Sequence, residues 1–282
     1  MHAAIDIAPL GELANVDTIV RLAVAAEAAG WDGISTWDSL GTGMGGAADP
    51  FVALAAVAGA TTRLRLIASV IAFPRRRPQL VAQAAATLDG WSHGRLVLGI
   101  GAGGDPGDFE PFGEPFDAAG RVRAMDEAAA LVDAYLRGEA VEHRGDLFSA
   151  HDATVGPRAS QRPRPPIWLG GMKPGALRRA ARWDGWIAVA TSEDGSAMAL
   201  PPDAFGRMAD RVRAERDALG LAGAPCDIAV FGFSGPAEAT ELAAGYERAG
   251  ATWWLESLSP MRGPMDALLD RIEAGPPATA TA

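Results

Sequence analysis

The sequence has few of the residues on which several common kinds of active site depend. Its single cysteine, Cys226, excludes an internal disulfide framework. Its only lysine is Lys173, so a Schiff-base mechanism would have one candidate residue. The four histidines form no H-E-x-x-H motif, no Ser/His/Asp triad spacing and no cluster of metal ligands. The sequence therefore predicts no metal site and little acid–base chemistry of its own.

Long apolar runs and positive charge are also scarce. The most lipid-like segment, Phe51 to Ala60, is about half the length of a bilayer span. The chain opens without a basic n-region, so we expect no signal peptide, no membrane association and a cytoplasmic location. The formal net charge of −10 argues against a nucleic-acid partner, because phosphate binding relies on an excess of Lys and Arg.

What the chain does contain is a regular alternation of short apolar runs and helical patterns. Each of the strand candidates is followed by a helix candidate, and the strands are 3–8, 33–37, 64–72, 96–98, 167–169, 185–190, 227–233 and 251–256. This count favours a closed (β/α)8 TIM barrel over an open sheet. We expect one barrel over residues 1–274, a small hairpin insertion near 138–150 and a disordered tail at 275–282.

A glycine-rich stretch, residues 94–104, marks the end of the fourth strand. Gly99, Gly101 and Gly104 spell G-x-G-x-x-G, the pattern of a dinucleotide-binding turn. That turn must open a helix, whereas residues 105–113 form an acidic loop rich in Pro and Gly. We therefore interpret the stretch as a strand that ends in a glycine-lined mouth, where a backbone can pass close to a ligand.

In a barrel, function lies at the carboxyl ends of the strands. There, residues 170–175 combine exposed amides at a helix start with Lys173, an arrangement that suits a phosphate. The run Arg75 to Arg77 lies on the same rim and could steer an anionic ligand, or could simply be a solvated face. His93 enters a strand, on the opposite rim, and is interpreted as structural. Few ionisable groups remain, which favours a site where a cofactor carries the reaction.

Several segments of the chain form an ordered series: 26–33 with Trp37-Asp38, 60–66, 87–89 with 92–96, 98–103, 165–171 and 180–185. This series resembles the bacterial luciferase-like flavin-dependent oxidoreductases over nearly the whole chain. The ending 249–256 with 271–277 is similar to a compact actinobacterial subgroup. The resemblance implies a barrel, often a homodimer, that carries the deazaflavin coenzyme F420 or reduced FMN. It also implies a small organic substrate and, as a partner, a flavin or F420 reductase.

The resemblance further implies where the cofactor would lie. A non-prolyl cis peptide bond would fall at Ser69-Val70 or one residue on, and the phosphate loop would fall on residues 171–175. Many members have His after the Asp of the second strand, but this chain has Ser39, so Asp38 and Ser39 are the candidate catalytic residues. The candidate cofactor-binding residues are Trp37, Ser69, Val70, Phe73, Gly99, Gly101, Gly170, Gly171, Met172, Lys173, Gly175 and Trp186.

Three functions stay open at this point. With the deazaflavin coenzyme, the chain would transfer a hydride to or from an apolar organic substrate. With reduced FMN, it would activate O2 and insert one oxygen atom. The polar-poor mouth and Ser39 also allow a non-catalytic cofactor-binding barrel. Substrate choice would rest on loops 39–49, 104–117 and 191–201, which carry no motif.

Overall fold

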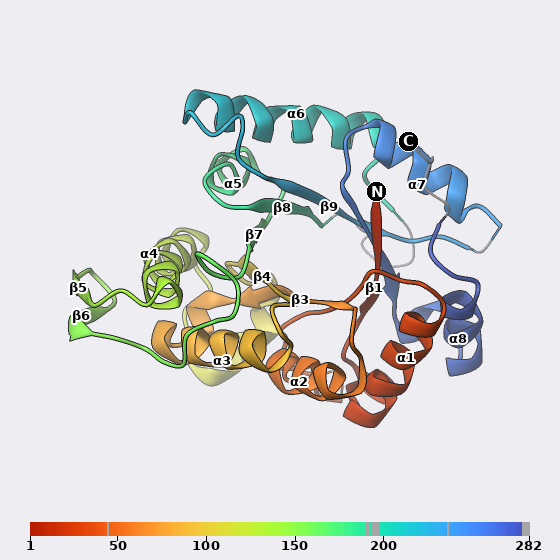
Figure 1. The fold of residues 1–282 in the computed structure, drawn as a ribbon, viewed down its shortest axis with the longest axis horizontal. Coiled ribbons are helices and arrows are strands. Elements are labelled where there is room, and N and C mark those ends of the chain that lie inside the picture. The colour runs from red at the N-terminus through yellow and green to blue at the C-terminus, as the bar shows by residue number, and fades with distance from the viewer. Residues whose placement is uncertain (44, 190–191, 193–197, 236, 278–282) are drawn as a thin grey trace.

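The computed structural model confirms a closed eight-stranded parallel barrel, and it describes residues 1–43, 45–189, 192, 198–235 and 237–277 (Figure 1). Each barrel strand pairs with the strands before and after it in chain order, and β10 pairs with β1 to close the ring. The strands are β1 (His2–Ile7), β2 (Gly33–Thr36), β3 (Arg65–Ala72), β4 (Leu96–Gly101), β7 (Ile167–Gly170), β8 (Gly185–Ala188), β9 (Asp227–Gly232) and β10 (Trp253–Leu258).

Helices alternate with these strands and surround the barrel (Figure 1). Local chemistry explains where they begin: Asp49 caps α2 by accepting from the amides of Phe51 and Val52, and Pro50 occupies the first helical position. The helices are α1 (Val16–Ala28), α2 (Pro50–Ala60), α3 (Pro78–Trp91), α4 (Ala118–Arg137), α5 (Pro174–Ala180), α6 (Pro202–Ala218), α7 (Ala239–Arg248) and α8 (Met265–Glu273).

Two apolar cores result, one inside the barrel and one between the barrel and its helices. The strands alternate their side chains between the two, as a pleated strand must. The inner core consists of Ala4, Ile67, Val97, Trp168, Ile187, Ala229, Phe231, Trp253 and Leu255, with Val70 packed against it. The rings of Trp168 and Trp253 are 5.7 Å apart. The barrel is therefore a filled core whose upper layer forms the floor of the mouth.

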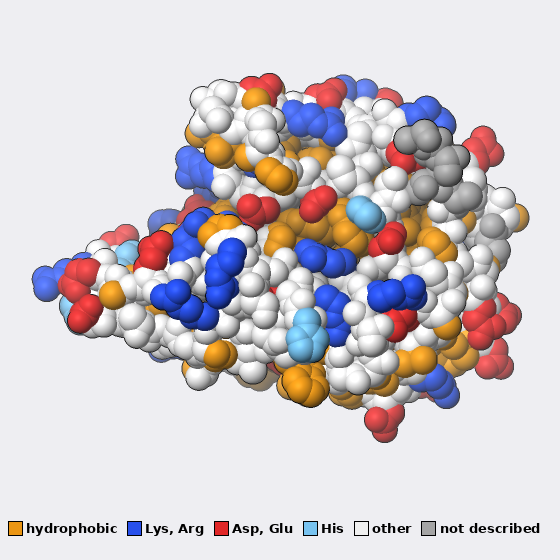
Figure 2. Space-filling model, viewed as in Figure 1, with side chains coloured by type: hydrophobic (Ala, Val, Ile, Leu, Met, Phe, Trp, Pro, Cys, Tyr) orange, Lys and Arg blue, Asp and Glu red, His pale blue; other side chains and the backbone are white. Residues whose placement is uncertain are grey.

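Two features interrupt the β/α repeat between β4 and β7. Strands β5 (Val141–Arg144) and β6 (Ser149–Ala153) form an antiparallel hairpin after α4 that projects from the barrel (Figure 1), and charged side chains of both signs cover it (Figure 2). The loop after Gly104 holds two 3-10 turns, η3 (Pro106–Asp108) and η4 (Glu110–Phe112), and no α-helix begins before Ala118. The tail at 278–282 lies outside the described residues. No described helix has the length and hydropathy to cross a membrane.

A glycine on β9 gives a test of how tightly the outer core is packed. A Cβ atom added at Gly232 would lie 1.9 Å from Cε2 of Trp254. We expect Gly232→Ala to lower the free energy of unfolding by about 1–3 kcal/mol, because the indole must move within a filled core. Denaturant unfolding measures this. Gly223→Ala is the matched control, since its Cβ would meet no atom within 4 Å; equal losses for both would contradict the prediction.

Candidate functional site

The mouth of the barrel is shaped by a bulge at the end of β3. The pairing register between β3 and β4 shifts between Ala68 and Ile71, and the Ser69-Val70 peptide bond is cis, as the resemblance predicts. Added Cβ atoms at Gly101 and Gly170 would each lie 2.8 Å from a methyl group of Val70. A Cβ at Gly99 would lie 2.6 Å from the carbonyl oxygen of Ala68. These glycines therefore make room for the bulge itself, whereas we expected them to make room for a ligand.

Asp38 holds this bulge from the side of β2. Its amide donates to the Val70 carbonyl, and its carboxylate accepts from the Ala72 amide at 3.0 Å. Arg76 donates two hydrogen bonds to the same carboxylate, and Arg75 lies 3.0 Å from it. The Asp38 side chain is only 1% exposed. All of these partners are groups of the chain itself, so Asp38 shapes the mouth. Its catalytic role stays a prediction.

Ser39 belongs to the same network. Its hydroxyl donates to Asp108 on η3 at 3.0 Å and accepts from the amide of Gly41. Asp108 also accepts from the amide of Leu40 at 2.8 Å, so one buried carboxylate joins the loop after β2 to the loop after β4. Ser39 thus links two loops of the rim, and its hydroxyl forms hydrogen bonds with groups of the protein itself.

These contacts change the interpretation of the arginine run. Arg76 pairs with both Asp38 and Asp49, and hydrogen bonds and charges from these carboxylates outweigh burial and raise its guanidinium pKa. Arg75 is 7% exposed and lies between Asp38 and Asp108. Only Arg77 of the three is exposed, and no ion pair forms to it among the described residues. The charge that could steer an anion is therefore smaller than the sequence indicated.

The loop from Gly170 to Gly175 has the features of an anion site. Gly171 takes a φ of 135°, and Lys173 is the N-cap residue of α5. Among the described residues, no acceptor is found for the amides of Met172, Lys173 and Gly175, and no carboxylate pairs with the exposed Lys173. Unpaired amides beside a cation suit a phosphate group.

The three predicted aromatic residues lie in different places. Trp186 is fully buried on the helix side of β8, stacks on Phe205, and donates from Nε1 to the Gly171 carbonyl at 2.8 Å. Trp186 therefore supports the loop 170–175, called the anion loop below, from the side that faces the helices. Phe73, at the start of the 3-10 turn η2 (Phe73–Arg75), belongs to the outer core. Trp37 is half-buried just beyond β2, and strand alternation places it on the mouth side, like Ser35.

One polar group at the mouth was not predicted. Asp6 on β1 is 2% exposed, and its Oδ1 atom has no hydrogen-bond partner. Burial raises its pKa from 3.8 to about 7, although the Ser35 side chain opposes the shift by hydrogen bonding. Ser35, opposite Asp6 on β2, forms a 2.5 Å hydrogen bond with Ser69. The only signal in the sequence is an aspartate within an apolar strand.

A second buried carboxylate lies on the helix side of β10. Glu256 is fully buried. Its carboxylate accepts a hydrogen bond from Arg271 at 3.0 Å and further hydrogen bonds from Arg262 and Ser234. Burial alone would raise its pKa, but the charges of Arg271 and Arg262 reverse the effect and lower it. This network ties the loop after β9 to the loop after β10, and so completes the rim.

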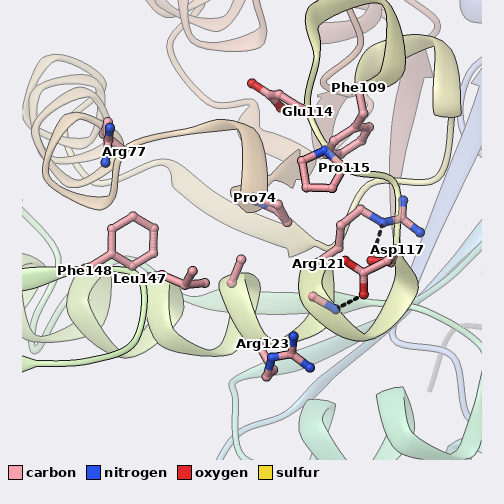
Figure 3. Close-up of a pocket in the computed structure, with 12 residues that line it drawn as sticks. Pro74, Arg77, Phe109, Glu114, Pro115, Asp117, Arg121, Arg123, Leu147 and Phe148 are labelled. Carbon is pink, nitrogen blue, oxygen red and sulfur yellow. Dashed lines mark hydrogen bonds between the residues drawn. The ribbon is translucent and has the colours of Figure 1, made fainter.

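A groove of about 420 Å³ is lined by none of the predicted site residues (Figure 3). It extends from Pro74 of η2 and from Phe109 along the start of α4 to the turn of the β5–β6 hairpin. Arg121 forms part of the groove wall, and its guanidinium lies 3.5 Å from the centre of the Phe116 ring. The lining residues are Pro74, Arg77, Phe109, Glu114, Pro115, Asp117, Gly120, Arg121, Arg123, Ala124, Leu147 and Phe148.

Three further expectations concern metal binding, His93 and the specificity loops. The described residues include no group of three or more His, Cys, Asp or Glu side chains that could hold a metal ion. His93 lies in the turn before β4, at the rim opposite the mouth. Of the expected specificity loops, residues 44, 191 and 193–197 lie outside the described residues.

The sequence of this chain is similar to those of known proteins. A family model described as luciferase-like monooxygenase matches residues 3–262. An uncharacterised protein of Mycobacterium tuberculosis is 34% identical over 187 residues, 66% of this chain. An F420-dependent glucose-6-phosphate dehydrogenase of Beutenbergia cavernae is 36% identical over 61% of the chain. An FMNH(2)-dependent dimethylsulfone monooxygenase of Pseudomonas putida is 30% identical over 46%. The matched regions span 60%, 52% and 36% of these relatives' own lengths.

Solved structures share the fold at lower identity. An F420-dependent secondary alcohol dehydrogenase, in complex with an F420-acetone adduct, superposes with a TM-score of 0.82 at 15% identity and covers 96% of this chain and 97% of its own. The F420-dependent tetrahydromethanopterin reductase of Methanopyrus kandleri gives a TM-score of 0.78 at 19% identity, with 97% and 96% covered. At these identities the likeness establishes the barrel and its closure, not the chemistry.

The role assigned to Asp38 predicts a large loss of stability when its charge is removed. In Asp38→Asn, the buried Arg75 guanidinium keeps only the distant Asp108 carboxylate, 3.9 Å away. We expect the free energy of unfolding to fall by about 3–5 kcal/mol, because one partner of a buried ion pair is lost. Denaturant unfolding checks this. Asp203→Asn, which removes an exposed pair with Arg207, should change stability very little.

Burial of Asp6 predicts a stability that depends on pH. The pKa is about 7 in the folded protein against 3.8 for the unperturbed group, so the folded state holds the proton through the window between them. Wild-type stability should fall relative to Asp6→Asn as pH rises from 4 to 8, by at most about 4 kcal/mol. Denaturant unfolding of both proteins across this range measures the difference. A difference that stays constant with pH would contradict the prediction.

Proposed function

Because this chain belongs to the luciferase-like monooxygenase family, we propose that it is an oxidoreductase that binds the deazaflavin coenzyme F420. It transfers a hydride to or from an apolar organic substrate. The bound coenzyme supplies the hydride chemistry at its ring, and the protein supplies binding, orientation and exclusion of water.

The anion loop is the observation that carries this proposal. Three backbone amides, at Met172, Lys173 and Gly175, have no acceptor among the described residues and lie beside the only lysine of the chain at the carboxyl end of β7. Trp186 fixes the loop by binding the Gly171 carbonyl. These groups fit the phosphate of a flavin-type cofactor. The ring would then extend from the phosphate across the mouth toward the Val70 bulge.

Two observations favour the deazaflavin over FMN. The F420-dependent relative is more similar to this chain than the FMNH(2)-dependent one, at 36% against 30% identity and over a longer matched region. The groove along the start of α4 is lined by Arg77, Arg121 and Arg123, which would suit the anionic tail that distinguishes F420 from FMN.

The surroundings of the mouth favour an apolar substrate. Ile187, Phe231 and Leu255 form the inner core below the rim, and they offer no hydrogen-bonding side-chain group. The nearby carboxylates of Asp38 and Asp108 are already paired with Arg75 and with rim amides. A substrate in this space would meet apolar side chains, and recognition would rest on its shape and on the exclusion of water.

A reduced-FMN monooxygenase is the second candidate function. The family description and the dimethylsulfone monooxygenase relative support it. The same anion loop would take the FMN phosphate, and the apolar mouth would keep bulk water from the ring.

A fluorescence titration of the purified protein distinguishes these functions. Coenzyme F420 and FMN are added separately, each oxidised and each reduced under anaerobic conditions. We expect F420 to bind at least tenfold more tightly than FMN, a difference of about 1.4 kcal/mol. Preference for reduced FMN, with oxygen consumption, would establish the monooxygenase instead. A protein that binds neither cofactor would contradict both functions.

Lys173 provides a specific test of the anion loop. We expect Lys173→Ala to weaken binding of F420 and FMN about tenfold, because a charge-assisted phosphate contact is lost. Binding of the dephosphorylated analogues, including riboflavin, should stay the same. Arg178→Ala, on the exposed side of the same helix, is the matched control and should affect neither class. An equal loss for phosphorylated and dephosphorylated ligands would contradict the anchoring role.

A further inference from the structure

We propose that Asp6 is the proton reservoir of this site and that it acts on the bound ligand through the hydroxyl groups of Ser35 and Ser69. The inference rests on the proposed function, because it needs a ligand at the mouth. Within the part of the chain that the structure describes, no hydrogen bond or ion pair is found between Asp6 and the anion loop, or between Asp6 and the rim residues Asp38, Ser39 and Asp108.

Position is the first argument. Asp6 lies two residues beyond Ala4 of the inner core, so its side chain faces the interior of the barrel at the level of the mouth. Its register partners are Ser35 on β2 and Ser257 on β10. A carboxyl oxygen that is buried without a partner is costly in an apolar core, which indicates a functional constraint on this residue.

Connectivity is the second argument. Ser35 is the register neighbour of Asp6 on β2 and its side chain lowers the pKa of Asp6. The Ser35 hydroxyl is itself 2.5 Å from the Ser69 hydroxyl, where either oxygen can be the donor. Ser69 begins the bulge, and the next residue, Val70, is packed between Gly101 and Gly170 at the mouth. A continuous line of exchangeable protons therefore runs from Asp6 to the segment over which the ring is proposed to lie.

The electrostatic surroundings leave Asp6 free to change its charge. Its register neighbours on β2 and β10 are the uncharged Ser35 and Ser257. The charged residue of β10, Glu256, faces the helix side and binds Arg262 and Arg271. The carboxylate beyond β2, Asp38, binds Arg75 and Arg76. No charged group of these elements therefore pairs with Asp6, and burial alone places its pKa near neutrality.

The protonation state of Asp6 sets the direction of the hydroxyl chain. A protonated Asp6 donates to Ser35, Ser35 donates to Ser69, and Ser69 can then donate to a ligand oxygen. An ionised Asp6 reverses every bond, so that Ser69 can only accept. Ser69 is thus the group that meets the ligand, and Asp6 determines what it offers.

The same chain can move the proton that accompanies hydride transfer to a carbonyl substrate. The carbonyl carbon accepts the hydride from the reduced coenzyme, which is oxidised, and the electron pair of the C=O π bond moves to oxygen. That oxygen takes a proton from Ser69, Ser69 takes one from Ser35, and Ser35 takes one from Asp6. The Asp6 carboxylate regains its proton from solvent, and alcohol oxidation runs the same steps in reverse.

Proton-linked binding tests the proposal without any turnover. Oxidised coenzyme F420 is titrated calorimetrically at pH 7 into the full-length protein, in two buffers free of phosphate that differ in their heat of ionisation, such as PIPES and Tris, and the difference in heat gives the protons taken up on binding. Wild-type protein should take up as much as about half a proton, because a ligand carbonyl favours protonated Asp6. Asp6→Asn should take up none, and Ser35→Ala should also take up none, since the chain is cut although Asp6 remains.

Ser257→Ala is the matched control, because Ser257 neighbours Asp6 but lies outside the hydroxyl chain; it should keep the wild-type uptake. Uptake that persists in Ser35→Ala would overturn the proposal, since Asp6 would then act through space. Binding with no uptake, or with proton release, in the wild type would also overturn it and leave the proposed function intact. Failure of the coenzyme to bind would instead reject the proposed function, and the reservoir with it.

Discussion

The bulge in β3 is the constraint on which the rest of the mouth depends. It turns Val70 toward β4 and β7, where only backbone fits beside it, since Cβ atoms at Gly101 and Gly170 would each lie 2.8 Å from its methyl groups. Asp38 binds the same segment from β2 through the Val70 carbonyl and the Ala72 amide. Backbone packing around the bulge therefore sets the shape of the site, and the large side chains pack against that backbone.

Charge in this protein serves mainly to hold loops. Asp38 with Arg75 and Arg76 joins the loops after β2 and β3, and Glu256 with Arg262 and Arg271 joins those after β9 and β10. Buried pairs of this kind contribute more to defining one geometry than to net stability. Among the described residues, what is left at the mouth is an apolar floor, the amides around Lys173 and the unpaired carboxyl oxygen of Asp6. Such a site suits a cofactor that carries the reaction.

Much of the fold follows from local patterns. The strand predicted over 64–72 is found over Arg65–Ala72, and each other predicted strand lies within a few residues of an observed one. Apolar runs of strand length, stopped by glycine and followed by helical periodicity, leave little choice but a repeated β/α unit. The position of the loop 170–175 between a strand and a helix start was also predictable from local patterns, and its role in binding a phosphate stays a prediction.

What the sequence by itself determined is therefore the repeat, its order and the loop that can hold a phosphate. Only the tertiary structure decided which groups each side chain of the site contacts. Trp186 faces the helices, the glycines accommodate Val70, and Arg75 and Arg76 are held by Asp38. Asp6 and Ser69 meet through Ser35 because β1, β2 and β3 are neighbours in register. A local pattern specifies which face of a strand is buried, but register and barrel closure decide which residues share that face.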